Sequence, residues 1–246
     1  PPVHTASAAT VTAPAVEGAD FKVSPLSTMR SAIAVNMEIS HNIPIATVSD
    51  YTEIDDLVEL RKKLNSQDSH LTFTPIIIKI MAAALKKYPL LNSHYDPVKK
   101  EVKTFNSINI GFATNTDAGL VVPTLRNVEK KSITELNEEI KLLSQKAQSR
   151  TIALDEMKGG TISVTNYGSF GGVYGVPKIN PPQVAILGVG RIHKAPYVKK
   201  DMVIPAYILP VTLVFDHRVI DGAYAGEFVS CFLKLANSPD KLFVSL

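Results

Sequence analysis

Residues 211–222 read Val-Thr-Leu-Val-Phe-Asp-His-Arg-Val-Ile-Asp-Gly. The first five are mainly apolar, β-branched or aromatic, which predicts a buried strand. Asp216-His217-Arg218 follows directly, and Asp221-Gly222 is typical of a turn that opens a helix. A lone histidine at a strand end is more often structural. Three polar or charged side chains together at such a place are costly unless they are used, so His217 is a candidate general base.

A second candidate stretch precedes this one at residues 159–172, Gly-Gly-Thr-Ile-Ser-Val-Thr-Asn-Tyr-Gly-Ser-Phe-Gly-Gly. The pattern predicts a strand at 161–166 that runs into a glycine-rich loop. Thr165 or Asn166 can then point into a cleft, where a hydroxyl would stabilise an oxyanion. The alternative is that threonine is simply a good strand residue and the glycines only make turns.

The rest of the chain alternates predicted helices and strands. Met29, Ile33 and Met37 recur at helical spacing, which predicts a helix over 26–40. Thr52 with Asp55 resembles a capping box that opens a helix with three inward apolar residues: Ile54, Leu57 and Leu64. Three further helices are predicted from a proline in the first turn, a second capping box and a glycine start: Pro75–Lys87, Ser132–Ser149 and Gly222–Ala236.

Seven further stretches have the composition of strands. They are residues 43–51, 93–96, 101–105, 107–116, 119–123, 184–190 and 203–216. The alternation lacks regular strand–helix–strand spacing, and no glycine-rich phosphate loop follows a strand. We therefore expect one mixed α/β domain over residues 22–246 rather than a dinucleotide-binding fold.

Composition excludes several classes of protein. The 246 residues are 45% hydrophobic with no Trp, which predicts an aliphatic core, and the net charge of +3 argues against nucleic acid as a partner. Cys231 is the only cysteine, so a disulfide scaffold and a cysteine-rich zinc site are excluded. No apolar run is long enough for a membrane span, so we expect no membrane partner. Of residues 1–20, 13 are Ala, Pro, Ser or Thr, and residues 1–21 are predicted to be an interdomain linker.

These motifs together carry a resemblance. Asp216–Gly222 resembles the His-x-x-x-Asp-Gly signature of dihydrolipoamide acyltransferases, the E2 components of 2-oxoacid dehydrogenase complexes. Four more stretches recur in family order: the Ser27–Met37 helix, Gly119–Pro123, Gly160–Gly172 and Asn180–Gly188. The resemblance covers residues 22–246. It implies an α/β (α+β) fold like that of chloramphenicol acetyltransferase: a two-layer mixed β-sheet with helices packed on it, trimeric.

The resemblance also implies a reaction, acyl transfer between dihydrolipoamide and coenzyme A. His217 matches the general base that deprotonates the attacking thiol, and Thr165 matches the hydroxyl that holds the tetrahedral oxyanion. Asp221 matches the signature aspartate, which we interpret as shaping the site. Coenzyme A is then a substrate, the lipoyl group is carried on a domain outside this segment, and no metal is implied.

The same resemblance implies a set of partners. The unit would be a homo-trimer with His217 from one subunit and Thr165 from its neighbour in one channel. Trimers would assemble into a larger hollow core through C-terminal contacts, which the apolar ending at 242–246 favours, although packing on its own domain is the alternative. The E1 and E3 enzymes would bind through other domains. A prokaryotic cytoplasm is expected, with the mitochondrial matrix as the alternative.

Some features depart from the family pattern. Val35-Asn36 stands where basic residues are often found, so Arg126, Lys130 and Lys131 become the candidates for binding coenzyme A phosphates, with a solvated loop as the alternative. Ala223 after Asp-Gly favours acetyl or branched-chain acyl groups over succinyl, whereas Thr165 occurs in succinyl members. The competing functions are a non-catalytic core subunit, a related acetyltransferase that acts on a small alcohol, and a peptide-forming condensation domain.

Overall fold

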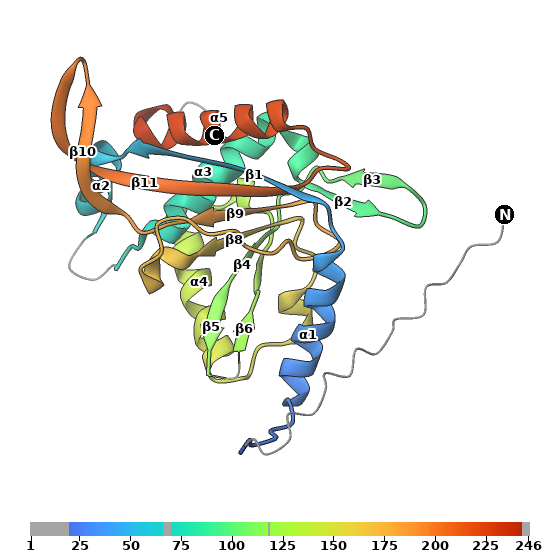
Figure 1. Cartoon of the computed structure of the whole chain (residues 1–246). Coiled ribbons are helices and arrows are strands. Elements are labelled where there is room, and N and C mark those ends of the chain that lie inside the picture. Colours follow the sequence, from blue (N-terminus) through green and yellow to red (C-terminus); the bar gives the residue numbers. More distant parts are fainter. Residues whose placement is uncertain (1–19, 66–69, 118, 243–246) are drawn as a thin grey trace.

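The computed structural model describes residues 20–65, 70–117 and 119–242, and its centre is a mixed seven-stranded sheet (Figure 1). Its strand order is β1-β11-β9-β8-β4-β7, with β10 paired to β11. The strands are β1 (Ile45–Glu53), β4 (Ile110–Phe112), β7 (Thr124–Leu125), β8 (Ile162–Asn166), β9 (Ala185–Val189), β10 (His193–Lys199) and β11 (Met202–Asp216). The pairs β4–β8 and β8–β9 are parallel, and the other pairs are antiparallel.

Strand β11 is the centre of this sheet. It pairs with β1 from Ile208 to Asp216 and with β9 from Val211 to Phe215, and its last nine residues are all buried. A strand covered on both faces needs a nearly continuous apolar sequence, as residues 208–215 have. The backbone that leads to residue 217 is therefore held by hydrogen bonds on both sides.

Four helices cover one face of the sheet or flank it: α2 (Asp55–Leu64), α3 (Phe73–Lys87), α4 (Ile133–Gln148) and α5 (Gly222–Asn237). Figure 1 shows α5 lying along β1 and β11, with α3 behind it. Alternate sheet residues such as Val164, Leu187 and Leu213 pack against these helices in one apolar core. The nearly all-apolar run of α3 is buried from Pro75 to Leu85, as its composition predicts.

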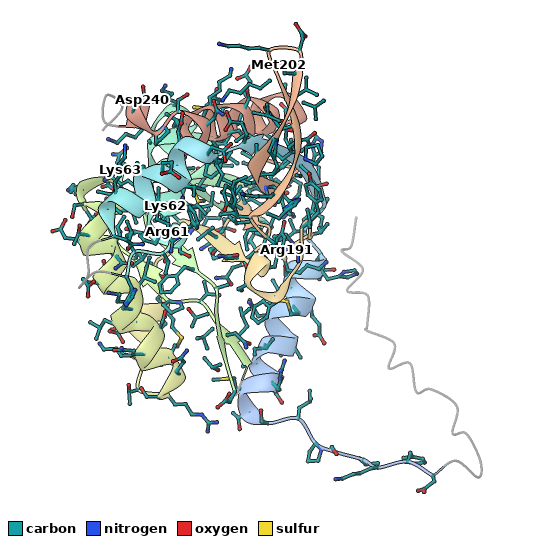
Figure 2. All side chains as sticks on the ribbon, turned by 90° about the vertical axis from the view of Figure 1, so that its left-hand side faces the viewer. Arg61, Lys62, Lys63, Arg191, Met202 and Asp240 are labelled. Carbon is teal, nitrogen blue, oxygen red and sulfur yellow. The ribbon has the colours of Figure 1, made fainter. Side chains whose placement is uncertain are left out.

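The opposite face of the sheet is more open. Helix α1 (Thr28–His41) stands at its edge beside the hairpin of β5 (Thr114–Thr116) and β6 (Gly119–Val121), and a Cβ at Gly119 would lie 3.1 Å from Ile33. A second hairpin joins β2 (Ser93–Asp96) to β3 (Glu101–Thr104). Short 3₁₀ turns occupy Pro89–Leu91, Val128–Lys130, Leu154–Met157, Tyr167–Phe170 and Pro239–Leu242. The β10–β11 hairpin projects from the body, and Figure 2 shows Met202 at its tip.

The predicted fold class is confirmed, and so are most of the predicted elements. The capping box of Ser132 and Glu135 is present at the start of α4, with both reciprocal hydrogen bonds. The predicted strand over 107–116 is divided into β4 and β5. Strand β10 was not predicted, because its residues 193–199 carry two lysines and a proline in an exposed ribbon.

Two predictions at helix α2 were wrong. Thr52 lies in β1, paired with Leu209, so it cannot cap the helix; Ile54 occupies the N-cap position without a side-chain hydrogen bond. Leu57 is fully buried, as predicted, but Leu64 is 43% exposed in the last turn of the helix. Strand pairing with β11 overrides the local capping signal because it extends β1 to Glu53.

Two expectations fall outside the described residues. These are the linker at 1–21, apart from its last two residues, and the apolar ending at 242–246, apart from the backbone of its first residue. Within the described part of the chain, no helix is long and apolar enough to cross a membrane.

The burial of α2 leads to a first prediction. Leu57→Ala should lower the free energy of unfolding by about 2–5 kcal/mol, because it leaves a cavity under the helix. Leu64→Ala is the matched control on the same helix and should cost less than about 1 kcal/mol. Urea denaturation followed by circular dichroism measures both. Equal losses would show that Leu64 is also a core residue.

Candidate active site

The turn after β11 is held by an ion pair that brackets His217. The buried carboxylate of Asp216 accepts hydrogen bonds from Arg218, at 2.9 Å from Nε to Oδ1 and 2.6 Å from Nη2 to Oδ2. The backbone N–H of Arg218 also donates to Oδ1 at 3.0 Å. The hydrogen bond with Asp216 raises the pKa of the Arg218 guanidinium, so the guanidinium stays charged.

His217 is exposed at the tip of this turn, while its backbone is fixed. Its N–H donates to the carbonyl of Pro44, just before β1, at 2.9 Å. Its ring centroid lies 5.7 Å from that of Phe215, at a tilted angle of 50°. A histidine with a fixed backbone and an exposed ring is placed to exchange protons with a molecule outside this chain's core.

Asp221 occupies the N-cap position of α5 and is exposed. Its side chain makes no capping hydrogen bond to the first turn of the helix. The histidine turn itself is held by the bond of Arg218 to Asp216, and the role of Asp221 in shaping the site stays a prediction.

Thr165 lies on the open face of the sheet, in the wall of a cavity of about 670 Å³. Its lining is mainly apolar and comes from α1, the β5–β6 hairpin and the loop after β8; it includes Ile33, Met37, Leu120, Val122, Tyr167, Phe170, Tyr174 and Val176. Thr165 is in register with Gly188 of β9. The ring of Tyr167 fills the space above Gly188, where an added Cβ would lie 2.7 Å from that ring.

Within one chain, Thr165 and His217 are far apart. Thr165 is level with Gly188, and Gly188 is level with Thr212, two strands away. His217 lies five residues beyond Thr212. At about 3.3 Å per residue and about 4.8 Å per strand, the two backbones are roughly 19 Å apart. One chain therefore does not bring these two residues into one site.

The three basic candidates lie on another part of the surface. Arg126 donates from Nη2 to the carbonyls of Asp155 and Lys158, at 2.8 and 3.2 Å. Lys131 pairs with Glu139 at 2.5 Å, and Lys130 is exposed beside it. Lys130 and Lys131 share a hollow at the start of α4, whereas Arg126 reaches the turn before β8. The structure thus does not gather the three at the Thr165 cavity.

Two site residues were missed in the sequence. Tyr95 of β2 stacks on the Arg218 guanidinium, whose Cζ lies 4.7 Å from the ring centroid, and no local pattern indicates this contact. Tyr167 stands two residues after Thr165 in a glycine-rich stretch, a signal for a side chain that needs space around it. Within the described residues, no group of three or more His, Cys, Asp or Glu side chains is placed to hold a metal ion.

The arrangement of sheet and helices matches a known class of acyltransferase fold. Chloramphenicol acetyltransferase superposes with a TM-score of 0.53 at 14% identity, covering 82% of this chain and 94% of that one. At this identity the likeness concerns the fold alone. It confirms the predicted chloramphenicol acetyltransferase-like architecture.

Much closer similarity places the chain within this class. Residues 18–244 match the 2-oxoacid dehydrogenases acyltransferase (catalytic domain) family, and the chain belongs to that family. The dihydrolipoyllysine-residue acetyltransferase component of the pyruvate dehydrogenase complex from Staphylococcus epidermidis is 41% identical over 221 residues, which are 88% of this chain and 51% of that protein. The chain thus spans about half the length of the curated relatives it matches.

Solved structures give the same result. The cubic core of the pyruvate dehydrogenase multienzyme complex superposes with a TM-score of 0.88 at 31% identity, covering 94% of this chain and 99% of that one. Azotobacter vinelandii dihydrolipoamide acetyltransferase superposes at 0.87 with 30% identity and the same coverage. The latter was solved to study the catalytic roles of a serine, a histidine and an asparagine. In that protein the histidine follows the serine by 52 residues and precedes the asparagine by four.

The packing around Gly188 leads to a second prediction. Gly188→Ala should lower the free energy of unfolding by about 1–3 kcal/mol, because the new methyl group collides with Tyr167 in the wall of the cavity. Gly226→Ala is the control, since a Cβ there meets nothing within 4 Å and the site lies inside α5. It should stabilise the protein by about 0.5–1 kcal/mol. Thermal unfolding separates the two, and a neutral Gly188→Ala would contradict the close packing.

Proposed function

We propose that this chain transfers an acetyl group between S-acetyl-dihydrolipoamide and coenzyme A, with His217 as general base. The observation that carries the proposal is a match in spacing. His217 follows Thr165 by 52 residues and precedes Asp221 by four, which are the separations of the serine, histidine and asparagine studied in the Azotobacter vinelandii enzyme. Membership of the acyltransferase family and the exposed ring of His217 agree with it.

The reaction then needs only a base that carries a proton and a hydroxyl that donates a hydrogen bond to the oxyanion. His217 takes the proton from the thiol of coenzyme A, and the thiolate attacks the thioester carbonyl carbon. The hydroxyl of Thr165 donates a hydrogen bond to the oxyanion of the tetrahedral intermediate. The bond from carbon to the dihydrolipoyl sulfur breaks, and that sulfur takes the proton back from His217. A thiol with an ordinary pKa of about 8.5 needs such a base near neutral pH.

The active site would be shared between two copies of this chain. The separation of roughly 19 Å between the Thr165 and His217 backbones supports this, because a hydrogen bond and a proton transfer must reach one thioester. Helix α1 also exposes apolar side chains beside the Thr165 cavity, with Val35 57% and Ile39 53% exposed. A homo-trimer with three such shared sites, assembled further into a hollow core, is the arrangement that we propose.

The remaining roles follow from the same assignment. Asp221 replaces the asparagine of the Azotobacter vinelandii enzyme, so a carboxylate rather than an amide would lie beside His217 and shape the site. The cavity at Thr165 would hold the apolar arm of a thiol substrate, since its lining is mainly apolar. Lys130 and Lys131 remain candidates for coenzyme A phosphates, while Arg126 would do so less readily because its guanidinium already bonds two carbonyls.

The wider setting belongs to the proposal as well. The lipoyl group would be carried on a domain outside this segment, and the E1 and E3 enzymes of a pyruvate dehydrogenase complex would bind elsewhere. The names of the staphylococcal relatives favour acetyl as the acyl group. A bacterial cytoplasm is the location that we propose. The alternatives of a purely structural core subunit and of an enzyme acting on a small alcohol are tested by the two experiments below.

The roles of His217 as base and of Thr165 as hydrogen-bond donor to the oxyanion give a third prediction. His217→Ala should abolish acetyl transfer to coenzyme A, and Thr165→Ala should lower kcat by about 10²–10³, while Thr165→Ser should stay active. Initial rates with acetyl-dihydrolipoamide measure this. His193→Ala is the control, because that side chain bonds the nearby carbonyl of Arg191 and has no part in the proposed reaction. Normal turnover in His217→Ala would exclude the base assignment.

Acyl preference and subunit sharing give a fourth prediction. The purified protein should use acetyl-CoA better than isobutyryl-CoA or succinyl-CoA with dihydrolipoamide as acceptor. Mixing His217→Ala subunits with Thr165→Ala subunits, unfolded and refolded together, should raise the activity above that of either variant alone, because some shared sites then hold both residues. Absence of any recovery, with a single-chain mass in gel filtration, would contradict the shared site.

A further inference from the structure

Beside His217 lies a charged pair that the proposed reaction does not use. Asp216 ends β11 with its carboxylate buried, and burying a lone carboxylate is costly unless it is paired. Arg218 supplies the partner through a forked contact, with Nε and Nη2 each bonded to a different carboxylate oxygen. Such a two-point contact fixes direction as well as distance.

This pair fixes the backbone on both sides of one residue. Asp216 and Arg218 are the immediate neighbours of His217, so their contact closes a ring around it. The carbonyl of Asp216 also accepts from the N–H groups of Val219 and Ile220, both at 3.0 Å. Together with the bond from the His217 N–H to Pro44, these contacts leave the peptide groups around His217 little freedom.

The pair is supported from outside by another hairpin. The Arg218 guanidinium lies over the ring of Tyr95 at 4.7 Å, and Tyr95 in turn donates its N–H to the carbonyl of Pro182 at 2.9 Å. The next segment is tied in as well, because Val184 bonds Ser93 and Asp216 bonds Val184 through their backbones. A guanidinium between a carboxylate and an aromatic face has its plane set by both.

We infer that Asp216, Arg218 and Tyr95 are positioning residues that set the direction in which the His217 ring leaves the turn. Because His217 is exposed, the approach of its ring to a thiol depends on the backbone that carries it. This inference rests on the proposed function, in which His217 is the base. It adds that the β2–β3 hairpin contributes to the reaction through Tyr95 without touching the substrate.

If these residues position His217, their substitution should lower kcat and leave KM nearly unchanged. Arg218→Met should lower kcat by ~10²-fold, since a misplacement of about 1 Å has that effect on a reaction. The KM values for coenzyme A and dihydrolipoamide should change less than about threefold, because binding groups are untouched.

Two milder variants keep the test valid if Arg218→Met does not fold. Arg218→Lys keeps the positive charge for Asp216 but lacks the fork and the flat stacking surface, so kcat should still fall by about tenfold. Tyr95→Phe keeps the ring and should match the unchanged protein, whereas Tyr95→Leu should be slower. Full activity of Arg218→Lys or Tyr95→Leu would overturn the inference.

A matched control exists on the far side of the molecule. Figure 2 labels Arg61 on α2. The Arg61 guanidinium also lies over an aromatic ring, that of Phe73 at 4.7 Å, and its Nε donates to the carbonyl of Leu71. Helix α2 lies far from His217. Ile54, just before α2, donates its N–H to the carbonyl of Tyr207, and Tyr207 precedes His217 by ten residues, which span roughly 33 Å in a strand. Arg61→Met should therefore leave kcat unchanged. An equal fall in both arginine variants would indicate general destabilisation and overturn the positioning role.

The experiment compares initial rates of full-length wild type and variants in one assay, together with a crystal structure of Arg218→Lys. A wild type without acyl transfer would refute the proposed function alone, and the crystal structure would still decide the inference. A displaced 216–220 turn supports it, and an unmoved turn with an unmoved His217 ring overturns it. An active wild type, an inactive His217→Ala and a fully active Arg218→Met would refute the inference alone.

Discussion

The burial of β11 on both of its faces is the constraint on which the rest of the structure depends. Helices α3 and α5 cover one face, β1 and β9 bond its edges, and the strand ends in a buried carboxylate. Because an unpaired carboxylate is not tolerated there, Arg218 must fold back onto Asp216. That closure turns the chain sharply, exposes His217 and starts α5 six residues after Asp216 ends the strand. The candidate base is thus a product of how the core strand terminates.

The open face of the sheet, opposite the helices, carries small and polar residues and a cavity. Its residues Thr165, Gly188 and Thr212 are small or polar, and Ser49 bonds Thr212 at 2.9 Å across the strands. The gap left by Gly188 accepts Tyr167, which in turn shapes the cavity beside Thr165. One face of the sheet therefore supplies stability and the other supplies a polar wall with an apolar cavity. The proposed reaction uses the second face and the exposed end of the central strand, which one chain cannot bring together.

Much of this organisation can be predicted from local patterns. The periodicity of apolar residues indicates α1, α3, α4 and α5, and the capping box at Ser132 indicates where α4 begins. His217, Thr165 and Asp221 stand out because charged or hydroxyl side chains follow apolar strands or precede glycine. Patterns fail where a distant partner decides the outcome: Thr52 enters β1 because β11 pairs with it, and Leu64 faces outward because the buried contacts of α2 end with its first turns.

The sequence by itself determined the mixed α/β class, the buried strand β11 and the three candidate site residues, since each of these depends on near neighbours in the chain. Only the tertiary structure decided that Arg218 holds the histidine turn through Asp216, that Tyr95 supports it, and that Thr165 and His217 stand far apart within one chain. Ion pairing, ring stacking and strand register depend on the free energy of interaction between groups that are distant in the chain and come into contact only on folding. A linear pattern records which side chains are available for such contacts, whereas the packed sheet selects which of them meet.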